Sequence, residues 1–248
     1  MNRHVALIAD IVIDRFEGQP LRNGAVVIQG EKIVAVGPAD EMIARYGPDM
    51  DVHQFPACTI LPGLIDPHVH LTFSGSRKPI AELQLDDDGE LCIRAVANAR
   101  AGLLAGITTL RDLGSRNATG LSIKKAFRSN VVPGPRVLVS GPPITTPEGH
   151  LHFLGGVAEG VDGVRATAIR LVEAGVDVIK LNATGGNMTL KSDPVKPQYS
   201  VEEIRAAVEV ANDAGIKVTV HARGVDGMRA AVRAGVHSVE HARMEIAQ

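Results

Sequence analysis

Two histidines lie two residues apart in the stretch LPGLIDPHVHL, residues 61–71, which is otherwise apolar and typical of a strand. Because alternate residues of a strand point to the same face, His68 and His70 are predicted to project side by side. A single histidine at a strand end is more often a satisfied polar residue than a ligand. Imidazole pairs, however, suit zinc and similar first-row ions, so the stretch indicates half of a metal site.

Further reactive side chains recur at strand ends later in the chain. Four segments share nearly the same phrase, namely AGITTLRD, AGVDVIKLN, AGIKVTVHA and AGVHSVEHA. Each follows a helix-like segment, and its glycine stands where a left-handed cap ends a helix. Five or six positions after the glycine comes a polar residue, and these residues are Asp112, Lys180, His221 and His241. The repetition predicts that several strand ends contribute to one site.

The elements that must position these side chains are strands alternating with helices. We expect strands near residues 60–65, 107–111, 136–140, 176–181, 216–221 and 236–241. Strands that are apolar nearly throughout pair in parallel, with both faces covered, in an α/β fold. An open doubly wound sheet and a (β/α)8 barrel both fit. The barrel is favoured, because its strand ends converge on one mouth, where active sites lie.

The first 59 residues have a different, all-β pattern. VALIADIVID, GAVVIQG and EKIVAVG are short, rich in Val and Ile, and bounded by Gly, Asn or Pro. The step Gln29-Gly30-Glu31 is a candidate hairpin, and residues 38–48 could hold a short helix. We therefore predict a small β domain over residues 1–59 and a barrel domain over residues 60–248.

The composition excludes several classes of partner. The formal net charge of −2 argues against nucleic acid, and no apolar run reaches the length of about 18 residues that a membrane helix needs. The first residues have no secretion-type cleavage site, and two cysteines form no disulfide framework. We expect a cytoplasmic homo-oligomer that acts on a small-molecule substrate and binds neither nucleic acid nor membrane.

Lys180 ends the strand VDVIK, and it either extends into solvent or points into the mouth. In the mouth, burial and neighbouring positive charge would favour its neutral amine. A neutral amine can add carbon dioxide and become a carbamate, which is an oxygen ligand able to bridge two metal ions. The run Asp86-Asp87-Asp88 is interpreted as a helix N-terminus that favours negative charge, rather than as a metal site.

The ordered set of motifs resembles the amidohydrolase superfamily. Its parts are HVH at a first barrel strand, a lysine ending strand 4, and histidines ending strands 5 and 6. AGITTLRDLG, VIKLNATGG, VTVHARG and SVEHA resemble in particular the imidazolonepropionase-like and Xaa-Pro dipeptidase-like members. NGAVVIQGEKIVAVGP followed by PGLIDPHVHL is similar to the N-terminal half of the small β-sandwich of that family, running into its barrel. The resemblance thus implies a (β/α)8 barrel with a small N-terminal β-sandwich domain.

The resemblance also implies a hydrolase with one or two metal ions, usually Zn2+. His68 and His70 would hold one ion, His221 and His241 a second, and a carboxylated Lys180 would bridge them in a binuclear metal centre. A metal-bound water would be the nucleophile that cleaves an amide-type C–N bond in a dipeptide, urea, carbamate or cyclic amide. Asp112, at the end of TTLRD, either orients a ligand imidazole or caps the next helix.

Two residues of the predicted mouth are assigned to substrate. In similar proteins a histidine of the loop after strand 3 contacts substrate, and His150 matches it better than His152; a solvated histidine is the alternative. Arg223 could bind a substrate carboxylate or form an outer salt bridge. The segment ATGGNMTLKSDP is predicted to be a mobile lid, with Gly185 and Gly186 giving slack.

The family pattern continues past the last residue, Gln248. Strands 7 and 8 are unmatched, and so is the strand-8 aspartate that the resemblance implies as metal ligand and general base; no catalytic residue is identified. The chain is part of a longer protein, or another chain completes the barrel, or the protein is a non-catalytic member that binds metal without turnover. We favour the first reading. We expect the 248-residue chain alone to be inactive or very weak, because the base that activates water is lost, and hydrolysis at a normal family rate would contradict this.

Overall fold

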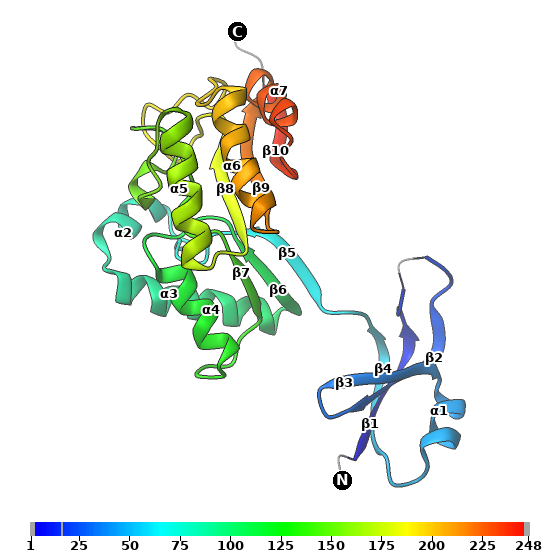
Figure 1. The fold of residues 1–248 in the computed structure, drawn as a ribbon. Coiled ribbons are helices and arrows are strands. Elements are labelled where there is room, and N and C mark those ends of the chain that lie inside the picture. The colour runs from blue at the N-terminus through cyan, green and yellow to red at the C-terminus, as the bar shows by residue number, and fades with distance from the viewer. Residues whose placement is uncertain (1–2, 16, 246–248) are drawn as a thin grey trace. The chain divides into compact units, whose positions relative to one another are not determined.

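The structure is a computed structural model that describes residues 3–15 and 17–245 (Figure 1). The chain divides into two compact units, Met1–Gly63 and Leu64–Gln248, which are described separately below. In the described part of the chain, no helix is both long and apolar enough to cross a membrane. The two cysteines are free thiols.

The first unit is a four-stranded sheet with one helix. Its strands are β1 His4–Val12, β2 Leu21–Gln29, β3 Lys32–Pro38 and β4 Asp51–Ile60, and its helix is α1 Ala39–Tyr46. The strand order is β3-β2-β1-β4, and β1 runs parallel to β4. The predicted hairpin is confirmed, since Gln29 pairs with Lys32 across the turn. Among residues 3–15 and 17–60 the strands form this one sheet, so the second layer of the expected sandwich stays a prediction.

The second unit alternates parallel strands with helices, as the sequence predicts. The strands are β5 Leu64–Val69, β6 Ile107–Asp112, β7 Arg136–Val139, β8 Val178–Asn182, β9 Lys217–Gly224 and β10 Ser238–Glu245. The helices are α2 Pro79–Leu85, α3 Asp88–Leu104, α4 Thr119–Arg128, α5 Gly160–Ala174, α6 Val201–Asp213 and α7 Val225–Ala234, with a 3-10 turn at His152–Leu154. The first of these strands begins later than expected, because the residues CTI belong to β4 and residues 61–63 form a link.

The six strands of this unit follow one another in chain order. β5-β6-β7 and β8-β9-β10 form parallel ladders, and between them Ile144 forms a parallel bridge with Leu181. Side chains from the first and last strand also meet, since the Glu240 carboxylate lies 2.8 Å from the His68 ring. The strands therefore curl around a shared interior. Closure into a complete (β/α)8 barrel stays a prediction.

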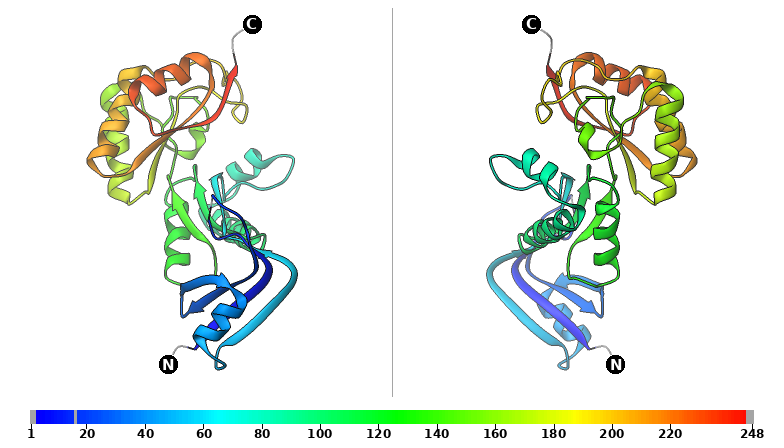
Figure 2. Two further views of the ribbon diagram at one scale, coloured as in Figure 1. Left: turned by 90° about the vertical axis from the view of Figure 1, so that its right-hand side faces the viewer. Right: turned by 90° about the vertical axis from the view of Figure 1, so that its left-hand side faces the viewer.

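Alternation along β8 and β9 separates a helix-facing side from this interior. Figures 1 and 2 show α5, α6 and α7 along β8, β9 and β10. Ile179, Leu181 and Val220 are fully buried in the core that these helices and strands share. The alternate positions carry Lys180 and His221, so the same pattern that builds the core sends polar side chains inward.

The helix ends behave as the sequence predicts. The glycines of the four AG phrases all have left-handed φ angles, namely 92° at Gly106, 88° at Gly175, 69° at Gly215 and 85° at Gly235. The interpretation of the acidic run is also confirmed. The Asp87 side chain accepts a hydrogen bond from the Glu90 N–H at 2.8 Å, and the Glu90 carboxylate accepts one from the Asp87 N–H at 2.9 Å, which is a capping box at the start of α3.

Asp112 has neither of the two roles considered for it. Its Oδ1 accepts a hydrogen bond at 3.1 Å from the backbone N–H of Leu71, and α4 begins only at Thr119. The neighbouring residue Arg111 points to the opposite face of β6, where its side chain contacts Glu240 in the interior. Asp112 therefore anchors the end of β5 from the adjacent strand. Burial raises the pKa of Asp112 to about 6.

Asp112→Asn is expected to increase stability at neutral pH but not near pH 4. The pKa of about 6 in the folded chain exceeds the ordinary value of 3.8, so the folded state holds a proton that the unfolded state has lost between these values. The free energy of unfolding therefore falls as pH rises through this window. The shift corresponds to a loss on the order of 3 kcal/mol, which asparagine avoids while keeping an acceptor for the Leu71 N–H.

Urea unfolding of the wild type and of Asp112→Asn from pH 4 to pH 7 measures this effect. Asp213→Asn, at an exposed site at the end of α6, is the control and should leave the pH profile unchanged. If the free energy of unfolding of Asp112→Asn and of the wild type changed with pH in parallel, the raised pKa of Asp112 would be contradicted.

Candidate functional site

A cavity of about 420 Å³ contains the side chains that the strands send inward. It is lined by His68, His70, His150, Leu151, Lys180, Asn182, Asn187, Met188, His221, Arg223, His241 and Arg243. The structure thus brings together the seven residues that sequence reasoning assigned to metal or substrate. The lining contains no aspartate or glutamate among the described residues, so its charged side chains are all basic.

The imidazoles of this cavity form a continuous series of ring contacts. The His68 ring centroid lies 5.4 Å from that of His70 and 5.0 Å from that of His241. The His221 centroid lies 4.7 Å from His241 and 4.5 Å from His150. Burial lowers the pKa to about 3 for His70, about 2 for His221, and about 4 for His150 and His241. These four rings are therefore neutral at physiological pH, and each keeps a nitrogen lone pair.

Hydrogen bonds decide which ring nitrogen carries the proton in three of the histidines. The Nδ1–H of His68 donates to the Glu240 carboxylate at 2.8 Å, and the Nδ1–H of His70 donates to the Gly114 carbonyl at 3.2 Å. The Nε2–H of His221 donates to the Gly185 carbonyl at 2.9 Å. Because these oxygens can only accept, each of these three nitrogens carries a hydrogen, and the neutral rings of His70 and His221 keep the lone pair on the other nitrogen. Partners of this kind orient metal-binding histidines in proteins.

Glu240 is a residue of this site that sequence reasoning missed. Its carboxylate accepts hydrogen bonds from His68, from Arg111 at 2.9 Å and from the Thr219 hydroxyl. Burial raises the pKa of Glu240, but the bonds from His68 and Thr219 outweigh burial and lower it to about 2. Glu240 is therefore a fixed anion that holds a histidine of β5 from β10.

A bend in β10 explains why Glu240 was missed. His241 and Ala242 have φ angles of 70° and 45°, in the left-handed region that residues other than glycine rarely adopt. The register with β9 shifts after His241. In a regular strand the neighbours Glu240 and His241 would point to opposite faces, whereas here both approach His68.

Lys180 lies deep in the same interior. It is 2% exposed, and its Nζ has no hydrogen-bond partner among the described residues. Burial lowers the pKa of Lys180 to about 7, although the charge of Glu240 acts in the opposite direction. A large fraction of the amine is therefore neutral near physiological pH, which is the chemical requirement for addition of carbon dioxide.

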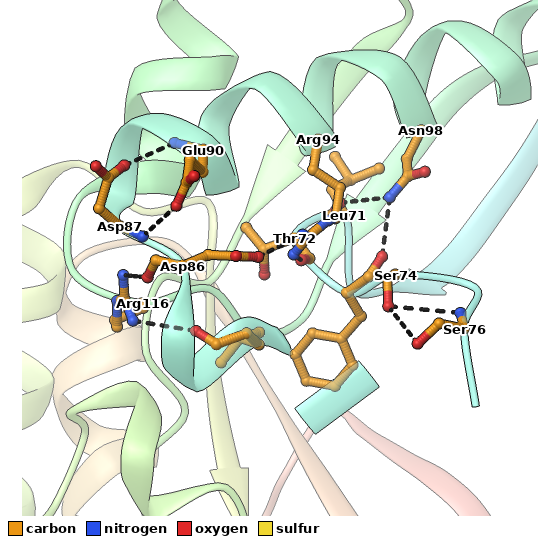
Figure 3. A network of polar contacts seen from close by, with 12 residues as sticks. Leu71, Thr72, Ser74, Ser76, Asp86, Asp87, Glu90, Arg94, Asn98 and Arg116 are labelled. Atoms are coloured by element: carbon orange, nitrogen blue, oxygen red, sulfur yellow. Dashed lines mark hydrogen bonds and ion pairs between the residues drawn. The ribbon is translucent and has the colours of Figure 1, made fainter. Parts of the chain in front are cut away.

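The turn that follows His70 is held by helix α3 (Figure 3). The side-chain amide of Asn98 donates to the carbonyls of Leu71 at 2.8 Å and Phe73 at 2.9 Å. The Arg94 guanidinium donates a further hydrogen bond at 3.3 Å to the carbonyl of Thr72, which lies between them. The His70 ring stacks on Phe73, with centroids 4.8 Å apart and an interplanar angle of 17°. Together with Asp112, these contacts fix the end of β5 and so the direction of His70.

The residues assigned to substrate lie at the wall of the cavity. His150 is 4% exposed, and its Nδ1 has no partner among the described residues. His152 is absent from the lining, and its Nδ1–H donates to the Gly149 carbonyl at 3.0 Å. Arg223 lines the cavity two positions after His221. Arg243 also lines the cavity and was not predicted. It follows His241 by two positions, as Arg223 follows His221, so the repeated spacing could have identified it.

The donor set fits a divalent first-row ion in its chemistry. Neutral imidazoles with one nitrogen fixed as a donor, beside a buried amine without a partner, are typical of a site for such an ion. As the side chains lie, however, no group of three or more His, Cys, Asp and Glu residues within the described ranges could hold a metal ion. A metal centre would require these rings to turn toward a common point.

Comparison with protein families gives two matches. The model of the amidohydrolase family matches residues 59–246, which is most of the chain. A model described as the imidazolonepropionase-like composite domain of bacteria matches residues 24–47, within the first unit.

Individual proteins agree with the family match. Ochratoxinase from Aspergillus niger is 30% identical over 264 residues, covering 91% of this chain and 52% of its own length. The crystal structure of a Xaa-Pro dipeptidase with bound methionine superposes with a TM-score of 0.86 at 29% identity, covering 98% of this chain and 63% of the other. The crystal structure of A. niger ochratoxinase gives a TM-score of 0.85 at 27% identity, covering 97% and 60%.

The 248 residues thus span about half the length of the ochratoxinase sequence. Over this span strands and helices alternate in the order that the sequence predicts. The family model covers all six parallel strands of the second unit. Of the sheet in the first unit it covers only the end of β4. On this match the chain belongs to the amidohydrolase family.

Proposed function

We propose that this protein is a metal-dependent hydrolase that cleaves an amide-type C–N bond. The observation that carries the proposal is the cavity itself, in which neutral imidazoles and the buried amine of Lys180 lie together. The names of the relatives, ochratoxinase and Xaa-Pro dipeptidase, support hydrolysis of amide bonds. Because the chain spans about half of such relatives, the activity of the whole protein is part of the proposal.

In this proposal His68, His70, His221 and His241 hold one or two ions, with zinc the first candidate, and carboxylated Lys180 adds an oxygen ligand. Carboxylation joins the neutral Nζ to the carbon of carbon dioxide and releases one proton. When bound, a divalent ion lowers the pKa of water and polarises the carbonyl under attack. The chain's own part is orientation, since Glu240 and the Gly185 carbonyl each fix one ring nitrogen as a donor.

The substrate in this proposal carries a carboxylate. Arg223 and Arg243 line a cavity whose described lining has no acidic residue, and a guanidinium binds a carboxylate through paired hydrogen bonds. The neutral ring of His150 can donate a hydrogen bond to the substrate carbonyl. Leu151 and Met188 add apolar wall. These features favour a dipeptide or acylated amino acid over an uncharged urea, carbamate or cyclic amide.

The proposal includes strands beyond the six described. The curl of β5 to β10 and the exposure of nearly every side chain of β4 support further segments, from a longer chain or a partner, that complete the barrel and the sandwich. The general base belongs to this part of the proposal. The alternative function is a non-catalytic metal-binding member of the family, and it predicts stoichiometric metal without turnover in a complete chain.

The first test is metal content. Protein purified without chelator is expected to contain one or two zinc or similar ions per chain by elemental analysis. His68→Ala and His221→Ala are expected to lose most of that metal, because each removes an imidazole ligand. His152→Ala is the matched control, since His152 lies outside the cavity lining. Equal metal content in His68→Ala and His152→Ala would contradict the proposed centre.

The second test concerns the carboxylate. Arg223→Ala is expected to weaken binding of acylated amino acids with a free carboxylate by about 10- to 100-fold, because a charged hydrogen bond is worth roughly 1.5–3 kcal/mol. The affinity for the corresponding carboxamides, which carry no charge at this position, should change little. Arg229→Ala, at an exposed site on α7, is the control. Competition binding with both ligand series measures the effect, and an equal loss for acids and carboxamides would argue against a carboxylate site.

A further inference from the structure

We infer that Gly185 and Gly186 are positioning residues, which set the rings of His221 and His150 against the cavity. Both glycines lie in the segment after β8 that the sequence analysis interpreted as a lid with slack. Their surroundings indicate instead a fixed wall, on which two imidazoles are aligned. The consequence for catalysis rests on the proposed function, whereas the alignment of the rings does not.

Gly185 acts through its carbonyl. That oxygen accepts the hydrogen bond from the His221 Nε2–H at 2.9 Å, which leaves Nδ1 of the ring as the free nitrogen. The peptide is itself held, since the Gly185 N–H donates to the Lys196 carbonyl at 3.2 Å. A Cβ at this position would lie 2.1 Å from the carbonyl oxygen of Asp193, closer than any side chain can approach. The absence of a side chain therefore lets the loop close over β9.

Gly186 acts through its missing Cβ. A Cβ there would lie 2.5 Å from Cε1, 2.6 Å from Nδ1 and 2.7 Å from Nε2 of the His150 ring. The backbone of Gly186 thus lies close against this ring, and the centroid of the His221 ring lies 4.5 Å from that of His150. The Gly186 N–H donates to the Ser192 hydroxyl at 3.2 Å, which holds the peptide in place. His150 can occupy its position only while residue 186 has no side chain.

The chain that follows the glycines is also tied to the cavity. Asn187 and Met188, directly after Gly186, are part of the cavity lining. Gln198, shortly after this segment, accepts a hydrogen bond from the His150 N–H at 2.8 Å and donates one to the Asn182 carbonyl at 3.1 Å. The expectation that the Gly-Gly pair supplies slack therefore does not match these contacts, because close approach accounts for both glycines.

Gly186→Ala tests the inference, since its added methyl group must displace the His150 ring. With histidine labelled by 15N, the imidazole signals of His150 and His221 are expected to shift, while those of His4 and His53 in the first unit stay unchanged. In the complete protein, turnover of an acylated amino acid is expected to fall on the order of 10- to 100-fold, because small misplacements near the reacting atoms slow reactions by such factors. Gly163→Ala, where a Cβ meets no atom within 4 Å, is the matched control.

A double variant separates positioning from general damage. In a His150→Ala background the clash is gone, so adding Gly186→Ala should cost no further activity and no folding stability. If Gly186→Ala alone fails to fold, the double variant should fold again. Unchanged ring signals in Gly186→Ala, or an equal loss with and without His150, would overturn the inference. Absence of turnover in every variant of the complete protein, wild type included, would count against the proposed function, and the ring signals would still decide the positioning role.

Discussion

The carboxylate of Glu240 is the contact on which the arrangement of the site depends. It joins β10 to β5 through His68, to β6 through Arg111 and to β9 through Thr219. A buried charge is tolerated only when it is paired and hydrogen-bonded, and here every oxygen has a partner. The curl of the strands and the direction of one imidazole thus share a single anchor.

Burial imposes the second constraint, because it sets the charge of the whole cavity. Removal from water lowers the pKa of four imidazoles and of the Lys180 amine, so burial favours the neutral forms of these groups, which keep a lone pair. A neutral imidazole still has one N–H that needs an acceptor. The Gly114 carbonyl meets this need for His70 and the Gly185 carbonyl for His221, while Glu240 accepts a hydrogen bond from His68. Acceptors placed by the fold therefore matter as much as the histidines themselves.

The sequence predicted the parts of this arrangement that follow from local periodicity. The strand and helix order, the left-handed glycines and the cap at Asp87 are confirmed, because each depends on neighbours along the chain. Asp112 was grouped with the interior residues by spacing alone, although alternation along β6 turns it toward the helices. Glu240 could not be predicted, since its role depends on left-handed backbone at the next residue and on partners from three other strands. The Gly185-Gly186 pair was read as flexible, because close packing against a ring has no local signature.

The cavity also limits where a proton acceptor can come from. Glu240 is hydrogen-bonded to the His68 imidazole, but although burial raises its pKa, the bonds from His68 and Thr219 lower it to about 2, so Glu240 takes up no proton at neutral pH. His150, with a pKa of about 4, is a weak base for the same purpose. Asp112 has a pKa of about 6, yet it bonds to the backbone of Leu71 outside the cavity lining. Among the described residues the cavity thus offers ligands and anion-binding groups without a suitable carboxylate base. A base supplied by a further strand is therefore what the hydrolase proposal requires and what the non-catalytic alternative does without.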